Sequence, residues 1–302
     1  MVTAVVVTHN RLQLLQRNIA CLRANAPVGR IIVVDNGSAD GTREWLDGEA
    51  DGRLRVVHQE NTGGSGGFHT GIAEACREGA DWVWCMDDDV FPRPDCLERM
   101  LPHTADARVG LVAPRRLVEG EVFTNDFTSY DLSHPFRSLY AGKLRKLPVP
   151  PSAPTPIAGT AFEGPLIRAA AIREIGLPNR DLFIFCDDTD YCLRLHRAGY
   201  RLLYVPDALM DKQKFFCDDT WAERNRKKKW KRFYQVRNST YLNHHYGRNT
   251  AVRYGRGLLC VLGYIFTVLA TIPFSRAYEW RDISRLWRAY LDGVHERLGR
   301  ME

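Results

Sequence analysis

The sequence predicts an α/β protein in which helices cover both faces of a mostly parallel β-sheet, followed by a C-terminal helical region. Three observations support this prediction. Continuously apolar segments alternate with helical periodicity over the first third of the chain, which is typical of a buried parallel sheet. Polar clusters follow the apolar segments directly. Beyond residue 212 come a basic run, a long apolar stretch and a cationic helix. We therefore expect a domain over residues 1–212 and a helical region over residues 213–302.

Four strands and the helices between them are predicted in order along the first third. The strand segments are AVVVTHN (4–10), RIIVVDN (30–36), LRVVHQ (54–59) and DWVWCMDDD (81–89). Helices are predicted at 11–26, 43–48 and 69–79. Residues 114–156 are irregular in pattern and rich in turn formers, so we interpret them as a loop or an excursion near the ligand-binding face. Residues 181–208 are predicted to form a strand, an acidic turn, a helix and a last strand.

Length, charge and cysteine content restrict the kind of protein further. A chain of 302 residues with 45% hydrophobic content can bury a large core, and a net charge of +6 does not indicate a uniformly basic surface. The eight cysteines include no CxxC pair. We interpret them as reduced thiols and expect no structural zinc site. The chain enters the first strand without a basic and apolar leader, so no signal peptide is expected.

The C-terminal region has two features that suggest a membrane surface. Residues 224–232 (RNRKKKWKR) hold seven cations and no acid, and residues 258–274 form an uncharged stretch of 17 residues. Such a pair can bind anionic headgroups and acyl chains together. We favour peripheral attachment over a span, because the stretch is short and Pro273 ends it. A solvated helix face, and a helix buried in a core or a dimer, are the alternatives.

The polar clusters indicate a nucleotide-sugar site rather than a nucleic-acid surface. Bases could stack on Trp221, Trp230 and Tyr234 beside the basic run, but the acidic clusters repel phosphate unless a metal intervenes. Open parallel sheets bind ligands at the carboxyl ends of their strands, where THN, DNGSADG, NTGGSGG and DDD all fall. Neither GxxxxGK[ST] nor GxGxxG is present, which disfavours an ATPase or a dehydrogenase.

The triplet Asp87, Asp88 and Asp89 places three like charges after a buried strand. A divalent metal held by carboxylates neutralises the charge that develops on a departing diphosphate. Asp87 and Asp89 are spaced to share one hard cation such as Mg²⁺ or Mn²⁺, and Asp87 could also contact the ribose. A solvated turn is the alternative, and Asp88 has no predicted role.

Further residues could bind the nucleoside. Asp35, at the end of the second strand, could accept a hydrogen bond from a pyrimidine ring N–H. Ser38 and Asp40 are better explained as turn and capping residues. Four glycines lack side chains and so let the backbone approach a ligand: Gly63, Gly64, Gly66 and Gly67.

A second acidic cluster, FCDDTDYCLR, follows a further apolar segment. Transfer of a sugar with inversion requires a base that takes the proton from the acceptor hydroxyl. Asp187, Asp188 and Asp190 are the candidates for this base. The alternative for Asp187 or Asp190 is a cap on the helix that follows.

These motifs together resemble the family 2 inverting glycosyltransferases of the GT-A (Rossmann-like) fold. The matching strings are VVVTHNR, IIVVDNGSADGT, NTGGSGGF, ADWVWCMDDDVFPRPD and FIFCDDTDYCLRLHRAGY, within Val2 to Ala208. Bacterial galactofuranosyltransferases and related rhamnosyltransferases are closest in pattern, because they share a GG-x-GGF loop and a DDD motif. The later segment RFYQVRNSTYL also looks like theirs.

The resemblance implies a role for each matching residue. Asp87 and Asp89 would form the DxD metal motif, and Asp188 would be the catalytic base. The donor would be bound by the nucleoside contacts Thr8, Asn10 and Asp35, and by Asn61 with Gly63, Gly64, Gly66 and Gly67.

One departure concerns the metal. Galactofuranosyltransferases usually place a metal-binding His shortly after the strand that follows the base helix. The segment VPDALMDKQKFF has Asp211 and Lys212 there instead. Asp211 could be the third ligand, water could replace it, or Lys212 could contact the diphosphate directly.

The resemblance also implies partners. UDP-galactofuranose is the preferred donor, with dTDP-rhamnose as the alternative, and the acceptor would be a glycan or a polyprenyl-linked glycan. The enzyme would work at the cytoplasmic face of the cell membrane, without nucleic acid and either alone or as a homo-oligomer. A non-catalytic nucleotide-sugar binding module is the alternative from another class.

Overall fold

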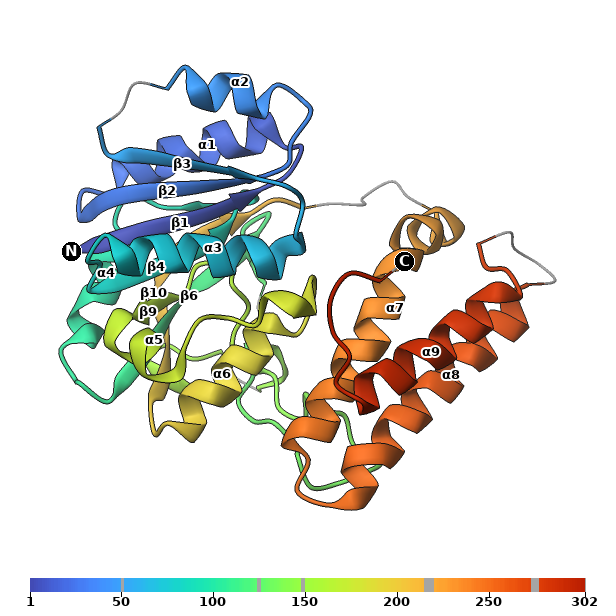
Figure 1. Cartoon of the computed structure of the whole chain (residues 1–302). Helices are drawn as coiled ribbons and strands as arrows, with labels where there is room; N and C mark the ends of the chain where they lie inside the picture. The colour runs from blue at the N-terminus through green and yellow to red at the C-terminus, as the bar shows by residue number, and fades with distance from the viewer. Residues whose placement is uncertain (50–51, 124–125, 148–149, 215–219, 273–276, 302) are drawn as a thin grey trace. The chain divides into compact units, whose positions relative to one another are not determined.

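The computed structural model describes residues 1–49, 52–123, 126–147, 150–214, 220–272 and 277–301, without the side chains of residues 221, 222 and 224. The predictions for Cys217, for the Trp221 and Arg224 side chains and for residues 273–274 lie outside these described residues. The chain forms two compact units (Figure 1). The first comprises Met1–Ser129, Gly142–Arg180 and Asp187–Lys214, and the second comprises Tyr130–Ala141, Asp181–Cys186 and Phe215–Glu302.

The first unit is built on one mixed sheet, which has ten strands among the described residues. Their order is β3-β2-β1-β4-β9-β6-β10-β5, with β7 on β6 and β8 on β10. The four strands from β3 to β4 are parallel, as are β6 and β10, whereas β9 runs antiparallel between β4 and β6. The strands are β1 (Val2–Thr8), β2 (Val28–Asn36), β3 (Leu54–Gln59), β4 (Trp82–Asp87), β5 (Val90–Pro92), β6 (Val109–Val118), β7 (Glu121–Val122), β8 (Thr155–Ile157), β9 (Leu166–Arg168) and β10 (Arg201–Lys212). The predicted α/β class is confirmed.

Helices cover both faces of the parallel strands, which is why those strands are apolar throughout. Ala4 and Val6 of β1 belong to the same core cluster as Leu15 and Ile19 of α1. The intervening residue Val5 faces α3 instead, because successive side chains of a strand point to opposite faces. Figure 1 shows α1 and α3 on the two sides of β1. The helices of this unit are α1 (Leu12–Ala24), α2 (Thr42–Asp47), α3 (Gly63–Arg77), α4 (Cys96–Met100), α5 (Ala169–Ile175) and α6 (Asp187–Arg197).

One expectation about local structure was wrong, and another was right in part. Residues 114–156, predicted as a loop or an excursion, include the second half of β6 and all of β7 and end in β8, and the described residues between β7 and β8 are mostly irregular. Residues 181–186 are not a strand. Phe183, Phe185 and Cys186 have φ values of 65°, 67° and 69°, in the left-handed region. The Asn238 amide donates to the carbonyls of Ile184 and Phe185, which satisfies backbone groups that a strand would have paired.

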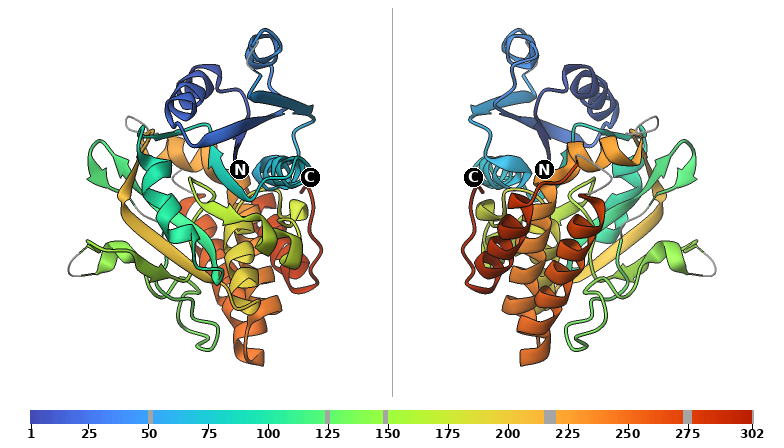
Figure 2. Two further views of the ribbon diagram at one scale, coloured as in Figure 1. Left: turned by 90° about the vertical axis from the view of Figure 1, so that its left-hand side faces the viewer. Right: turned by 90° about the vertical axis from the view of Figure 1, so that its right-hand side faces the viewer.

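The second unit is a helical assembly of α7 (Trp221–Tyr246), a π-helical turn (Ala251–Arg256), α8 (Gly257–Thr271) and α9 (Arg281–Val294). Figure 2 shows α7, α8 and α9 side by side. Their shared core includes Val236, Val261, Val268 and Ala289. Six of the described cysteines are free thiols, namely Cys21, Cys76, Cys85, Cys96, Cys192 and Cys260.

One face of α8 packs in this core and the other is exposed. Val261 and Val268 are buried, whereas Leu259, Leu262 and Phe266 are exposed, Phe266 by 72%. Within the described residues, Ala251–Thr271 is a helix long and apolar enough to cross a membrane, which by itself is weak evidence of a span.

Candidate functional site

The carboxyl ends of the central strands bring the predicted polar clusters together. Thr8 of β1 lies in register with Asp35 of β2, and Asp35 with His58 of β3. On the other side of β1, Val7 lies in register with Asp87 of β4. The clusters therefore share one edge of the sheet, as parallel strands dictate.

Both carboxylate oxygens of Asp35 already have partners within the protein. It is 2% exposed, and its carboxylate accepts hydrogen bonds from the Ser38 backbone N–H (3.0 Å) and pairs with His58 Nδ1 (2.8 Å). A pyrimidine N–H would have to share one of these oxygens. Asp40 accepts from the N–H groups of Leu12 (3.1 Å) and Thr42 (3.2 Å), which confirms it as a turn and capping residue.

Asn10 and Asn61 lie at this edge of the sheet, and both contact His9. The Nε2 atom of His9 is 3.2 Å from the amide nitrogen of each asparagine. The Asn10 amide oxygen accepts from the Ala39 N–H (2.7 Å), and that of Asn61 accepts from the Gly63 N–H (2.9 Å). Asn10 and Asn61, both predicted to contact the nucleotide sugar, thus lie close together. His9 lies between them, and the sequence analysis gave it no role.

The glycine-rich segment is the first part of α3 rather than a loop. A Cβ atom on Gly67 would lie 2.4 Å from Val7 Cγ1, and one on Gly66 would lie 2.2 Å from Thr62 Oγ1. Gly67 therefore allows α3 to pack closely on β1, and Gly66 leaves room for the Thr62 side chain at the start of the same helix, so neither glycine needs a ligand to explain it. Gly63 has a φ of 75°, which only glycine adopts at little cost. A Cβ on Gly64 would meet nothing within 4 Å, so Gly64 is the one of the four open to a ligand.

Asp88, the residue without a predicted role, is a structural anchor. It is 2% exposed and accepts hydrogen bonds from Thr8 Oγ1 (2.7 Å) and Arg11 Nη1 (2.9 Å). The Thr8 hydroxyl, a predicted nucleoside contact, therefore points at Asp88. Burial raises the pKa of Asp88, and the charge of Arg11 opposes that rise.

Asp89 belongs to a network of ion pairs in which acidic and basic side chains alternate. Arg11 Nη1 is 3.3 Å from Asp89 Oδ2, and Lys212 Nζ is 3.1 Å from Asp89 Oδ1. Lys212 also contacts Glu163 (3.0 Å), and Glu163 contacts Arg116 (2.8 Å). Arg116 in turn contacts Asp126 (2.7 Å), and the side chains of this last pair are 1% and 0% exposed.

Sequence reasoning missed most of this charge network. Arg11, Glu163, Arg116 and Asp126 had no predicted role, although Arg116 gave a signal. It lies beside Arg115 in the mostly apolar segment VGLVAPRRLV, and an arginine inside a buried strand needs acidic partners.

Asp87 differs from its two neighbours because its carboxylate has no hydrogen-bond or ion-pair partner among the described residues. Burial, followed by the negative charges of Asp89 and Glu163, raises its pKa well above the ordinary range.

Asp211 is not part of this cluster. Arg93 pairs with its carboxylate at 3.1 Å and 3.3 Å. Asp211 and Lys212 are successive residues of β10, so their side chains point to opposite faces of the sheet, and it is Lys212 that reaches Asp89. Asp211 is therefore not retained as a metal ligand.

The residues at the end of β4 do not fit the predicted metal site. In the described parts of the chain, no three His, Cys, Asp or Glu side chains are arranged to hold a metal ion. Asp89 already has two cationic partners, and an ammonium group lies where a cation would approach it. Of the predicted pair Asp87 and Asp89, only Asp87 has a carboxylate without an ion-pair or hydrogen-bond partner among the described residues.

The second acidic cluster begins α6 and has a different environment. The Asp188 carboxylate accepts hydrogen bonds from the Thr189 N–H (2.5 Å) and Oγ1 (3.1 Å). Burial and the adjacent charge of Asp187 raise the pKa of Asp188 to about 7. Burial raises the pKa of Asp187 to about 6, and hydrogen bonding to its carboxylate opposes that rise. Asp190 pairs with Arg194 at 3.6 Å.

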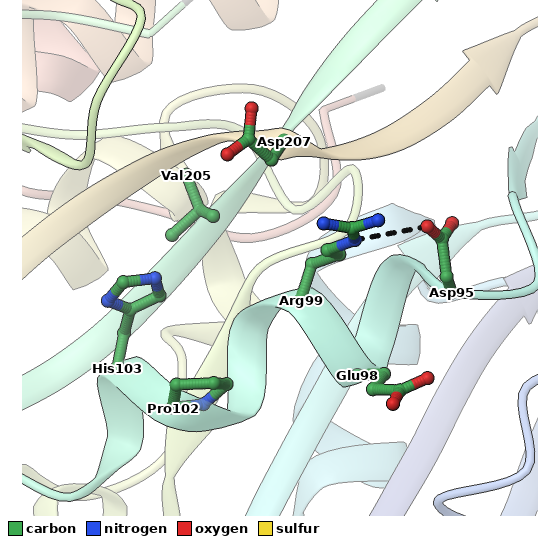
Figure 3. Close-up of a pocket in the computed structure, with 7 residues that line it drawn as sticks. All are labelled: Asp95, Glu98, Arg99, Pro102, His103, Val205 and Asp207. Atoms are coloured by element: carbon green, nitrogen blue, oxygen red, sulfur yellow. Dashed lines mark hydrogen bonds and ion pairs between the residues drawn. The ribbon is translucent and has the colours of Figure 1, made fainter.

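A separate polar hollow lies between α4 and β10 (Figure 3). Its lining includes Asp95, Arg99, His103 and Asp207 and none of the predicted site residues. Arg99 is neutralised by Asp95, at 3.1 Å, so we assign no function to this hollow.

Comparison with known proteins identifies the family. The family model described as glycosyl transferase family 2 matches residues 3–162, which is more than half of the chain. The chain belongs to this family.

Two relatives and one structure show the extent of the likeness. The pre-mycofactocin glycosyltransferase of Mycobacterium tuberculosis is 36% identical over 69% of this chain and 42% of its own length. The galactofuranosyltransferase GlfT1 of the same species is 33% identical over 66% of this chain and 65% of its own length. The chain thus spans less than two thirds of either relative.

The fold of this family 2 member also matches a solved structure. The mannosyltransferase PcManGT from Pyrobaculum calidifontis, solved with GDP-Man and Mn²⁺, is 17% identical, with a TM-score of 0.56 over 98% of this chain and 87% of that one. At this identity the likeness shows the fold alone. The predicted GT-A fold is confirmed.

Proposed function

We propose that this chain is an inverting glycosyltransferase that moves a sugar from a nucleotide-sugar donor to a glycan or a lipid-linked glycan. Asp188 is the observation that carries the proposal. A general base works best when its pKa lies near the operating pH, and the pKa of Asp188 is raised to about 7. Asp188 has hydrogen bonds only to Thr189 among the described residues, so no cation holds its carboxylate.

The proposed reaction is a single displacement. Asp188 takes the proton from an acceptor hydroxyl, and the oxygen forms a bond with the anomeric carbon of the donor sugar. The bond between that carbon and the phosphate oxygen breaks, and its electron pair leaves with the nucleoside diphosphate. Attack on the face opposite the leaving group inverts the anomeric configuration.

The donor we favour is UDP-galactofuranose, with dTDP-rhamnose as the alternative. The match to GlfT1 supports galactofuranose. The nucleoside would lie at the edge formed by Asn10, Asp35 and Asn61 with Gly64, where the described side chains leave an approach. The diphosphate would then lie toward Asp87 and Asp89 at the end of β4.

Transfer from both donors tests the proposal, with Asp188→Asn as the decisive variant. An amide cannot take the acceptor proton, so transfer should fall by about 10²-fold to 10⁴-fold while donor binding stays near the wild-type value. Asp207→Asn removes an exposed carboxylate and serves as the control. Retention of most of the rate by Asp188→Asn would refute the assignment of the base.

We further propose that the second unit attaches to the cytoplasmic face of a membrane. Leu259, Leu262 and Phe266 form an exposed apolar face on α8, and Lys227 and Lys228 are exposed on α7. Acyl chains suit the first feature and anionic headgroups the second.

Flotation with liposomes tests this attachment. The chain should float with anionic vesicles and float less as the variant Phe266→Ser, because burying one phenylalanine contributes about 1.5–3 kcal/mol. Phe136→Ser removes an exposed ring at another position and is the control. A wild-type chain that stays at the bottom of the gradient would exclude attachment.

A further inference from the structure

Lys212 holds a fixed positive charge inside the acidic cluster at the end of β4. Its Nζ atom is 3.1 Å from Asp89 Oδ1 and 3.0 Å from Glu163 Oε1, and its side chain is 12% exposed. Arg116 holds the other oxygen of Glu163 at 2.8 Å. The carboxylates of Asp89 and Glu163 therefore hold the Lys212 ammonium group in one position. On an exposed lysine the flexible side chain would let this group adopt many positions.

The ammonium group retains one unused donor. A lysine has three N–H donors and no acceptor. Asp89 and Glu163 take two of them, and the third has no acceptor within the described residues. An oxygen of a diphosphate would be a charge-assisted partner for this third donor.

The same ammonium group opposes a divalent cation on Asp89. Two positive charges a few ångströms apart in a partly buried site repel each other strongly. Lys212 could only make way by leaving Asp89 and Glu163, which would remove the cation that pairs with both. Asp211, the other candidate in this segment, points to the opposite face and pairs with Arg93.

We propose that Lys212, in place of a divalent metal, supplies the positive charge that stabilises the departing diphosphate. This inference rests on the proposed function, because it assumes a nucleoside diphosphate at the end of β4. It replaces the predicted Mg²⁺ or Mn²⁺ with a residue of the chain.

Nucleotide binding by the whole chain tests the inference without reference to turnover. Isothermal titration calorimetry with UDP, dTDP and GDP is carried out in EDTA and again in MnCl₂. The wild type should bind its preferred nucleotide in EDTA with an affinity within about threefold of that in Mn²⁺. Lys212→Met should bind about 10-fold to 100-fold more weakly, because a charged hydrogen bond is lost. Lys214→Met removes an exposed cation two residues away and should bind like the wild type.

Lys212→His sharpens the experiment. A histidine at this position can act as a metal ligand and carries no fixed charge, so this variant should bind nucleotide about as weakly as Lys212→Met in EDTA and more tightly when Mn²⁺ is added. Nucleotide binding in EDTA by this variant at the wild-type level would overturn the inference.

The remaining outcomes separate this inference from the proposed function. Wild-type binding that requires Mn²⁺ overturns the inference and leaves glycosyl transfer standing. Binding of none of the three nucleotides in either buffer overturns both. If Lys212→Met does not fold, as judged by circular dichroism, the wild-type comparison decides alone.

Discussion

The two acidic clusters of the first unit contain the same residue type in opposite electrostatic settings. Asp88 and Asp89 contact Arg11 and Lys212, in a network that continues to the buried Arg116. Asp188 has no cationic partner among the described residues, and its pKa is raised to about 7. Among the described residues Asp88 and Asp89 have cationic partners whereas Asp87 and Asp188 have none, and burial raises the pKa of both Asp87 and Asp188. What differs is the partner that folding gives each carboxylate, not the run of aspartates itself.

The largest expected effect removes a cation from the first cluster. Arg116→Met should lower the free energy of unfolding by about 3–5 kcal/mol, because it leaves Asp126 buried without its charge partner. Arg93→Met breaks an exposed Arg–Asp pair and should cost only about 0–1 kcal/mol. Urea denaturation measures both. Equal losses would show that burial does not distinguish the two pairs.

Neutralising Glu163, which shares Lys212 with Asp89 of the first cluster, and neutralising Asp188 of the second cluster should change the free energy of unfolding in opposite directions. Lys212 and Arg116 overcome the effect of burial and lower the pKa of Glu163, so its charge stabilises the fold above the pKa of the unfolded chain. Glu163→Gln should therefore destabilise by about 1.5–3 kcal/mol at pH 8.

Asp188→Asn should instead stabilise at pH 8, by on the order of 1 kcal/mol. The raised pKa means that the wild type gains stability as the pH falls and loses it as the pH rises through about 7. The gain from Asp188→Asn should accordingly shrink between pH 8 and pH 5. Thermal unfolding at both values measures it, and destabilisation at pH 8 would contradict the comparison.

The pH dependence of transfer compares the two clusters through activity instead of stability. Only ionised Asp188 can accept a proton, so kcat/KM should rise about tenfold per pH unit below a pKa near 7 and level off above it. Steady-state rates from pH 5 to pH 9 measure the profile. A profile that stays flat down to pH 5 would mean that a carboxylate of ordinary pKa is the base.

Periodicity predicted the sheet because it is a local property. The strands ending at Thr8, Asn36, Gln59 and Asp87 and the helix with Leu15 and Ile19 follow from spacing that each segment carries by itself. The strand predicted from the local pattern at residues 181–186 does not form, because a tertiary contact holds that segment in another conformation. The apolar residues 181–186 resemble a strand, but the amide of Asn238 binds their carbonyls in another conformation.

The sequence by itself therefore determined the fold class and placed the polar clusters at one edge of the sheet, and it offered Asp187, Asp188 and Asp190 as candidates for the base, among which the family resemblance selected Asp188. Only the tertiary structure decided which charges meet there. Arg11 and Lys212 reach Asp89 from 78 and 123 residues away along the chain, and Asp211 turns to Arg93. Strand and helix periods depend on neighbours in sequence, whereas Coulomb interactions depend on distance in space, so folding alone fixes their partners.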